Sequence, residues 1–116
     1  MFHNYISKKK ALVMLQDGRK GFVMTNVKTK DPDEFILGMI NVLKLDMNLF
    51  NQPSLISNKQ TGTYDICFFV KASVAPNVTH LQLSKLVSNI NSVTGCVSLE
   101  DYIKSIAVSA LSFLNF

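Results

Sequence analysis

The sequence predicts an α+β domain in which an antiparallel sheet of about four strands carries three helices, in the order ββαββαα. Three observations support this: an Asp-Gly pair between two apolar runs, a strand-like alternation in the second half, and three segments with helical spacing and capping residues at their starts. A chain of 116 residues that is 47% hydrophobic can bury a core without a metal or disulfide. We therefore expect residues 1–116 to form one domain, with its helices on one face of the sheet.

The first two strands are expected to form a hairpin. Residues 11–16 are an almost continuous apolar run, and residues 21–27 are a second one. Asp17-Gly18 lies between them, and glycine readily takes the positive φ that a tight turn demands. Because both faces of residues 11–16 carry apolar side chains, this strand should be central or covered on both sides.

The first helix is predicted to begin after Asp31, which is a suitable N-cap. Pro32 follows at the first helical position, where its missing N–H is not needed, and Glu34 lies three residues after the cap. Gly38 indicates close packing against a strand. The apolar face should end near Asp46 and consists of Phe35, Ile36, Met39, Ile40 and Leu43.

A second pair of strands is predicted at residues 54–58 and 63–72, separated by the turn-forming stretch 59–62. In the longer strand, apolar and mixed positions alternate with the period of two that a strand imposes on its side chains. The wholly apolar face consists of Tyr64, Ile66, Phe68 and Val70.

Two further helices are expected near the end of the chain. Thr79 and Gln82 have the spacing of a capping box, and Gly95 is expected to stop the helix that they begin. Ser98, with Asp101 three residues later, should begin the last helix. That helix is apolar around most of its circumference, so we expect it to be buried in the core of the domain or against another subunit.

The positive charge is concentrated near the start of the chain. The formal net charge is +4, but residues 1–30 hold seven basic side chains and one acid, a balance of +6. The other 86 residues hold five lysines and seven acids, a balance of −2. This asymmetry favours a polyanion or an acidic protein surface as partner, although the lysines could also act only by keeping an apolar chain from associating.

The predicted hairpin would place this charge in two groups. The start of its first strand would lie beside the end of its second, and the tip would be roughly 20 Å away. Such a spacing suits contacts to several phosphates, which predicts a small non-enzymatic DNA- or RNA-binding accessory or regulatory protein. The candidate nucleic-acid-binding residues are Lys8, Lys9 and Lys10, expected beside Lys28 and Lys30, then Arg19 and Lys20 at the tip, and Tyr5 as a stacking ring.

The last helix leads to an alternative hypothesis, a protein-binding regulator or inhibitor, for example of a host factor. An apolar helical surface of this kind could dock a partner or a second copy of the chain, giving a homodimer. The candidate interface residues are Tyr102, Ile106, Ala110 and Phe113.

Neither an enzymatic activity nor a cofactor is indicated by the sequence. The four best metal ligands, His3, His80, Cys67 and Cys96, are not at chelating spacings, and no nucleophile or phosphate-loop motif occurs. With no signal-peptide pattern and no apolar run long enough to span a bilayer, we expect a cytoplasmic protein without a membrane partner. The excess of lysine over arginine is typical of AT-rich genomes, among them those of phages and mobile elements.

Overall fold

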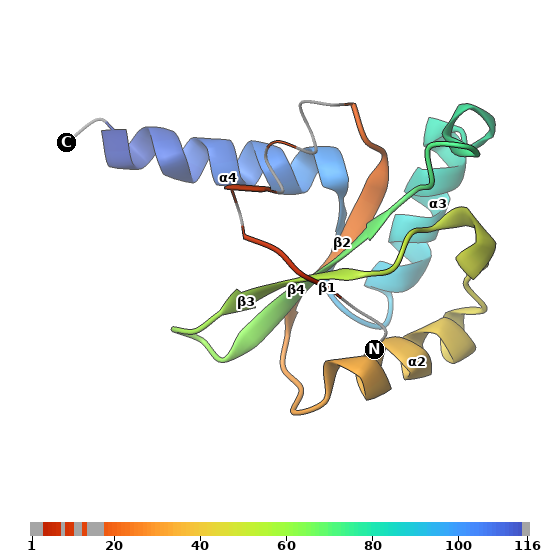
Figure 1. The fold of residues 1–116 in the computed structure, drawn as a ribbon, viewed down its shortest axis with the longest axis horizontal. Coiled ribbons are helices and arrows are strands. Elements are labelled where there is room, and N and C mark those ends of the chain that lie inside the picture. The colour runs from red at the N-terminus through yellow and green to blue at the C-terminus, as the bar shows by residue number, and fades with distance from the viewer. Residues whose placement is uncertain (1–3, 8, 11–12, 14–17, 115–116) are drawn as a thin grey trace.

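The structure, a computed structural model, describes residues 4–7, 9–10, 13 and 18–114, and the side chains of the last helix as far as Ile106. Within these ranges the chain forms a five-stranded sheet with three α-helices (Figure 1). In chain order the elements are β1 (Asn4–Tyr5), β2 (Gly21–Val27), α2 (Pro32–Leu43), the 3-10 turn η1 (Met47–Leu49), β3 (Ser54–Asn58), β4 (Thr63–Phe69), the 3-10 turn η2 (Ala75–Asn77), α3 (His80–Asn91), β5 (Cys96–Ser98) and α4 (Leu99–Leu114).

The α+β class with three helices is confirmed, but the sheet differs in detail from the prediction. Its strand order is β1-β3-β4-β2-β5, and it is mixed rather than antiparallel because β1 runs parallel to β3. The strands that the sequence did not predict are the two edges, β1 with two residues and β5 with three. Neither is long enough for an alternation of period two to be recognised.

The predicted first hairpin is wrong. A strand has only two neighbours in a sheet, and both sides of β2 are occupied, by β4 and β5. The strands beside β2 are therefore not the predicted one, and Val13, the one described residue of the predicted strand, is helical; its other residues lie outside the described part of the structure. A short continuous apolar run fits a buried strand or a helix equally well, so the sequence pattern could not identify the neighbours of β2.

The central four strands form two interlocked split β-α-β units. In the first unit, α2 connects β2 to β3, and β4 lies between these two strands; in the second, α3 connects β4 to β5, and β2 lies between them. Each unit thus fills the gap in the other. This is the ferredoxin-like order of strands, with β1 added at one edge and α4 after the last strand.

The helices cover both faces of the sheet, which corrects the expectation that they share one. Helices α2 and α3 pack on one face and α4 lies across the other, as Figure 1 shows. Alternate residues of β2 and β4 serve the two layers: Phe22 and Phe68 belong to the first core, and Val23 and Phe69 to the second. The predicted apolar face of residues 64, 66, 68 and 70 is confirmed as part of the first core.

The centre of the first core is a group of three phenylalanine rings. Phe22 and Phe68 stack with their ring centroids 4.9 Å apart, and Phe50 meets them edge-on at 5.4 and 5.9 Å. Phe22 and Phe68 are completely buried. Rings in these offset and edge-on geometries add to the stability that burial alone provides, so this part of β2 is firmly fixed.

The predicted helix starts are confirmed by their hydrogen bonds. The N–H of Glu34 donates to the Asp31 carboxylate at 3.2 Å, and Thr79 and Gln82 form the reciprocal capping box at the start of α3. The N–H of Asp101 donates to the Ser98 hydroxyl at 3.1 Å. Two glycine interpretations fail. Nothing approaches a Cβ built at Gly38, and α3 ends at Asn91, before Gly95, which instead leaves room for the Thr25 hydroxyl.

Candidate functional site

The predicted basic residues around β2 lie at its two ends. Arg19 and Lys20 precede the strand, and Lys28 and Lys30 follow it. Seven extended residues separate the two groups by about 23 Å. Because β2 is a central strand with buried residues on both faces, this separation is held by the core of the protein.

The remaining predicted binding residues that the structure describes are not part of either group. Lys8 lies outside the described residues, and Lys9 and Lys10 are exposed. The expectation that they lie beside Lys28 depended on the first hairpin and fails with it. Tyr5 is 61% exposed on β1, which is three strand spacings, about 14 Å, from β2.

Lys59 joins the group after β2, and the sequence alone did not indicate this. Val27 pairs with Tyr64 of β4, while Asn58, at the end of β3, pairs with Thr63. Lys28 and Lys59 therefore leave the sheet at the same end, about two strand spacings or 10 Å apart. We call the exposed residues Lys28, Lys30 and Lys59 the lysine end. Three acids at the start of α2 follow Lys30 directly and partly offset this charge.

Arg19 and Lys20, at the other end, are held by specific contacts. The Lys20 ammonium donates to the carbonyls of Ala75 and Val78 at 3.0 and 3.1 Å. The Arg19 guanidinium lies 5.5 Å from the centre of the Phe69 ring, and its Nη2 donates to the Val70 carbonyl at 3.4 Å. Both cations are thus positioned by the loop and strand that they contact.

The start of β2 also borders a small cavity of about 90 Å³ between the N-terminal ends of α3 and α4. Arg19 and Lys20 line it from the strand, His80 and Ser84 from α3, and Ser98 from the end of β5. We call this group the arginine end. The sequence predicted its first two members, but the other three come from segments that only the tertiary fold brings together.

The predicted interface residues on α4 divide between the core and the undescribed side chains. Tyr102 is only 7% exposed and Ile106 is half-buried, and both pack in the second core. The backbone of Ala110 and Phe113 belongs to α4, whereas their side chains lie outside the described part of the structure. The described apolar side chains Leu99, Tyr102, Ile103 and Ile106 therefore hold the first half of α4 on the sheet.

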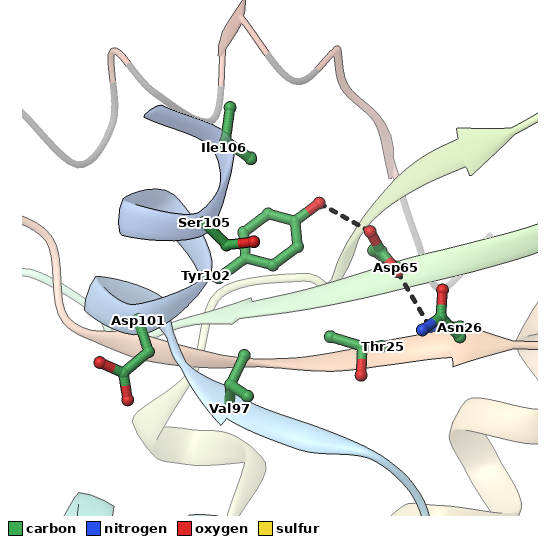
Figure 2. Close-up of a pocket in the computed structure, with 8 residues that line it drawn as sticks. All are labelled: Thr25, Asn26, Asp65, Val97, Asp101, Tyr102, Ser105 and Ile106. Carbon is green, nitrogen blue, oxygen red and sulfur yellow. Dashed lines mark hydrogen bonds between the residues drawn. The ribbon is translucent and has the colours of Figure 1, made fainter. Parts of the chain in front are cut away.

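Tyr102 also takes part in a polar cluster beneath α4. Its hydroxyl donates to the Asp65 carboxylate at 2.8 Å, and the other oxygen of Asp65 accepts the N–H of Asn26 at 2.9 Å (Figure 2). Asn26 has a positive φ of 55° in an irregularity of β2. Burial, together with the hydrogen bond and charge of Asp65, raises the pKa of Tyr102 well above its ordinary value.

A cavity of about 340 Å³ lies beside this cluster and is lined by carboxylates, hydroxyls and an amide (Figure 2). Both oxygens of Asp65 already accept hydrogen bonds within the protein, and Asp101 is an exposed acid in the first turn of α4, where the helix dipole stabilises it. These contacts give both Asp65 and Asp101 a structural role beside the cavity.

The thiols do not form a reactive or metal-binding site in the described structure. Burial raises the pKa of both Cys67 and Cys96 from 9.0 to about 12, and at Cys67 the charge of Asp65 adds to this effect. A thiol with such a pKa is a poor nucleophile at neutral pH. Among the residues described, no three His, Cys, Asp or Glu side chains are grouped so that they could hold a metal ion.

Comparisons of this chain with protein-family models, curated proteins and solved structures found no match. Nor does the described part of the chain contain a helix with the length and apolar character needed to cross a membrane. The function therefore has to be inferred from the placement of the residues themselves.

Proposed function

We propose that this protein is a small non-enzymatic accessory or regulatory protein that binds nucleic acid through the basic side chains at the two ends of β2. The observation that carries the proposal is the fixed separation of the arginine end and the lysine end by one buried strand. A distance of about 23 Å corresponds to the rise of about seven base pairs, at 3.4 Å each. Two such ends can contact phosphates of one strand without a groove-reading element.

The two ends contribute in different ways. At the lysine end, three exposed side chains offer mobile point charges, which favour attraction to phosphates without sequence preference. At the arginine end the cations are held by neighbouring carbonyls and a ring, so they offer a defined geometry. Lys20 still presents a charged ammonium on an exposed residue, since two carbonyls use two of its three N–H donors.

Stacking on the open face of a sheet, as in RNA-binding four-stranded sheets, is not the mode proposed for this protein. Phe69 is the ring nearest Arg19, and it is 1% exposed because α4 covers that face. The alternative hypothesis, a partner surface on α4, has less support for a related reason: Tyr102 and Ile106 are used in the second core.

The first prediction concerns the lysine end. The double variant Lys28→Gln/Lys30→Gln should bind a fluorescent single-stranded or duplex oligonucleotide more weakly, because two phosphate contacts are lost. The slope of log affinity against log salt should become shallower by about 1.4 to 1.8, at 0.7 to 0.9 per contact. Fluorescence anisotropy titrations at salt concentrations between about 50 and 200 mM measure both the affinity and the salt slope.

The matched control is Lys44→Gln/Lys85→Gln, which removes the same charge from two exposed lysines, one at the C-cap of α2 and one on α3. This variant should retain most of the affinity and the salt slope. The proposal is refuted if the native protein shows no binding at low salt. Equal losses in the two double variants would refute the assignment to the lysine end.

A further inference from the structure

An apolar hollow lies beside the first core, where α3 meets the two 3-10 turns. It has a volume of about 410 Å³ and is lined by η1, η2, α3 and the residues next to them. Three of its apolar residues are at most 9% exposed and three are half-buried. An open apolar hollow marks a place where a ligand or partner would bury it. We call it the apolar groove; its apolar residues are Phe50, Val78 and Leu83, then Leu49, Val74 and Leu86.

Two side-chain amides also line the groove. The side-chain carbonyl of Gln82 accepts the N–H of Thr79 at 2.8 Å in the capping box, so its NH₂ group remains as a donor. Asn77 is exposed and presents a second amide. The polar part of the lining therefore suits a ligand that carries acceptor oxygens.

Two lysines border the groove through direct contacts with its residues. The Lys20 ammonium donates to the carbonyl of Val78 at 3.1 Å. The N–H of Lys71 donates to the carbonyl of Leu49 at 2.8 Å, and the carbonyl of Lys71 accepts the N–H of Val74 at 3.1 Å. Lys71 thus lies between two groove residues, and positive charge borders the groove at two places.

Negative charge is scarce around the groove. Residues 66–91, which form most of it, include two lysines, one histidine and no acid. Asp46, three residues before Leu49, is the acid closest in the sequence to a groove residue, and its carboxylate accepts the N–H of Asn48 at 3.0 Å. One acid against two bordering lysines leaves the border positive. A partner with complementary charge would carry acids beside its apolar residues.

We propose that the apolar groove binds an acidic amphipathic segment of another protein, with its apolar side chains in the groove and its carboxylates at the lysines. This inference goes beyond the nucleic-acid binding proposed above and does not rest on it, since neither the groove nor Lys71 belongs to the two ends of β2. A second copy of this chain fits less well, because each copy has a formal net charge of +4. A nucleobase also fits less well, because Phe50, the aromatic residue in the lining, is only 4% exposed.

A library of displayed random peptides of about 14 residues, or about four helical turns, identifies the preferred segment. Enriched sequences should combine apolar residues at helical spacing with an excess of Asp and Glu. In ¹⁵N-correlated NMR spectra, the best peptide should shift the amides of Val74, Val78 and Leu86, and its affinity should fall as salt rises. Lack of enrichment, or enriched peptides without an excess of acids, would overturn the proposal.

A charge swap tests the border of the groove. The probes are the best peptide and a copy in which every Asp and Glu is replaced by Lys. Lys71→Glu should lower the ratio of the affinity for the acidic peptide to that for the basic copy by about tenfold, because an attraction becomes a repulsion. This ratio does not depend on the fraction of the variant that folds.

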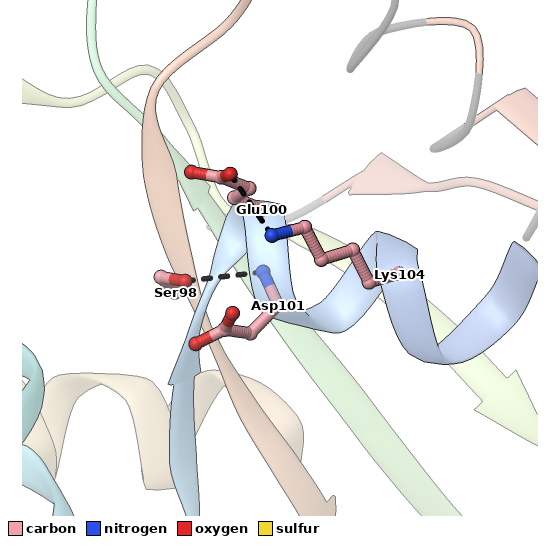
Figure 3. A network of polar contacts seen from close by, with 4 residues as sticks. All are labelled: Ser98, Glu100, Asp101 and Lys104. Carbon is pink, nitrogen blue, oxygen red and sulfur yellow. Dashed lines mark hydrogen bonds and ion pairs between the residues drawn. The ribbon is translucent and has the colours of Figure 1, made fainter.

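The matched control for the charge swap is Lys104→Glu on α4, across the sheet from the groove. The Lys104 ammonium lies 3.2 Å from the Glu100 carboxylate, as Figure 3 shows, and the lysine side chain is 69% exposed. This variant should leave the ratio of affinities nearly unchanged. A fall as large as that for Lys71→Glu would overturn the placement of the acids at the groove.

A pair of leucines on α3 tests the apolar contact. Leu86→Gln, which adds an amide to the groove, should weaken the binding of the best peptide by about tenfold. Leu81→Gln changes a leucine that is 63% exposed on the same helix and does not line the groove, so the affinity should stay unchanged. Equal losses in the two variants would overturn the groove as the binding site.

Other occupants would give different results. Shifts of the groove amides with an oligonucleotide, but not with the peptide, would overturn the proposal and assign the groove to nucleic acid. Shifts that grow with protein concentration alone would assign it to a second copy of the chain. The anisotropy titrations with Lys28→Gln/Lys30→Gln are a separate test, and their failure would leave the groove proposal in place.

Discussion

Tyr102 shows how one side chain joins two parts of the molecule. Its ring packs in the second core, while its hydroxyl reaches Asp65 on β4, whose other oxygen accepts the N–H of Asn26 on β2. Helix α4, β4 and β2 are therefore tied together through one carboxylate. Asn26 has a positive φ, which asparagine tolerates better than most residues, and its N–H is held by Asp65.

The variant Tyr102→Phe tests the strength of this tie. It removes the hydroxyl, so one oxygen of Asp65 no longer accepts a hydrogen bond from α4. The free energy of unfolding should therefore fall by about 1 to 2 kcal/mol. Urea unfolding followed by circular dichroism measures the change. Tyr64→Phe is the control, because the hydroxyl of this half-buried tyrosine makes no hydrogen bond in the described structure. A loss for Tyr64→Phe as large as that for Tyr102→Phe would count against the role of Asp65.

Elements that depend on local chemistry could be predicted from the sequence. The caps at Asp31, Thr79 and Ser98 were predicted correctly. At a helix start, the side-chain oxygen of the cap lies close to the N–H three residues later, whatever the rest of the fold. The alternation in β4 is also read correctly, since it needs only a period of two. These signals lie within a few residues of one another.

Elements that depend on distant partners could not be predicted. The neighbours of β2 are an example, because β5 reaches one edge of β2 only after α3 has crossed the sheet. The sheet face that α4 covers could not be predicted for a similar reason, since a helix that is apolar on most sides can pack in several directions. The arginine end shares this limit: its strand residues were predicted, but His80, Ser84 and Ser98 join them only through the tertiary fold.

Two glycines provide a test at this scale with opposite expected results. A Cβ at Gly21 would collide with the backbone carbonyl of Phe68 on the neighbouring strand, whereas a Cβ at Gly38 on α2 would meet nothing within 4 Å. Gly21→Ala should therefore destabilise strongly, by about 3 kcal/mol or more, because two central strands must separate. Gly38→Ala should stabilise by about 0.5 to 1 kcal/mol, through helix propensity. Thermal and urea unfolding measure both, and a destabilised Gly38→Ala variant would contradict the open surroundings.

On the scale of the whole molecule, the described residues form two cores that share one sheet. Cys96 lies in the first core, 4% exposed, and Cys67 lies in the second, completely buried. Adjacent residues of β4 point to opposite faces of the sheet. Cys67 and Phe68 therefore belong to different cores, although they are consecutive in the chain. Loss of either layer would expose one side of the same strands to water. We therefore expect the two cores to unfold together.

The thiols report on both cores when the pH is raised. Burial lifts the pKa of each from 9.0 to about 12, so the folded state holds its thiol protons longer than the unfolded state. The stability that this contributes is complete below pH 9 and is lost as the pH rises toward 12, by up to about 1.4 kcal/mol per pH unit for each thiol. In urea unfolding at a series of pH values, Cys67→Ala and Cys96→Ala should each reduce the slope. If the cores open together, a thiol reagent should modify both cysteines at one rate. Faster modification of Cys67 would show instead that α4 leaves the sheet while the first core stays folded.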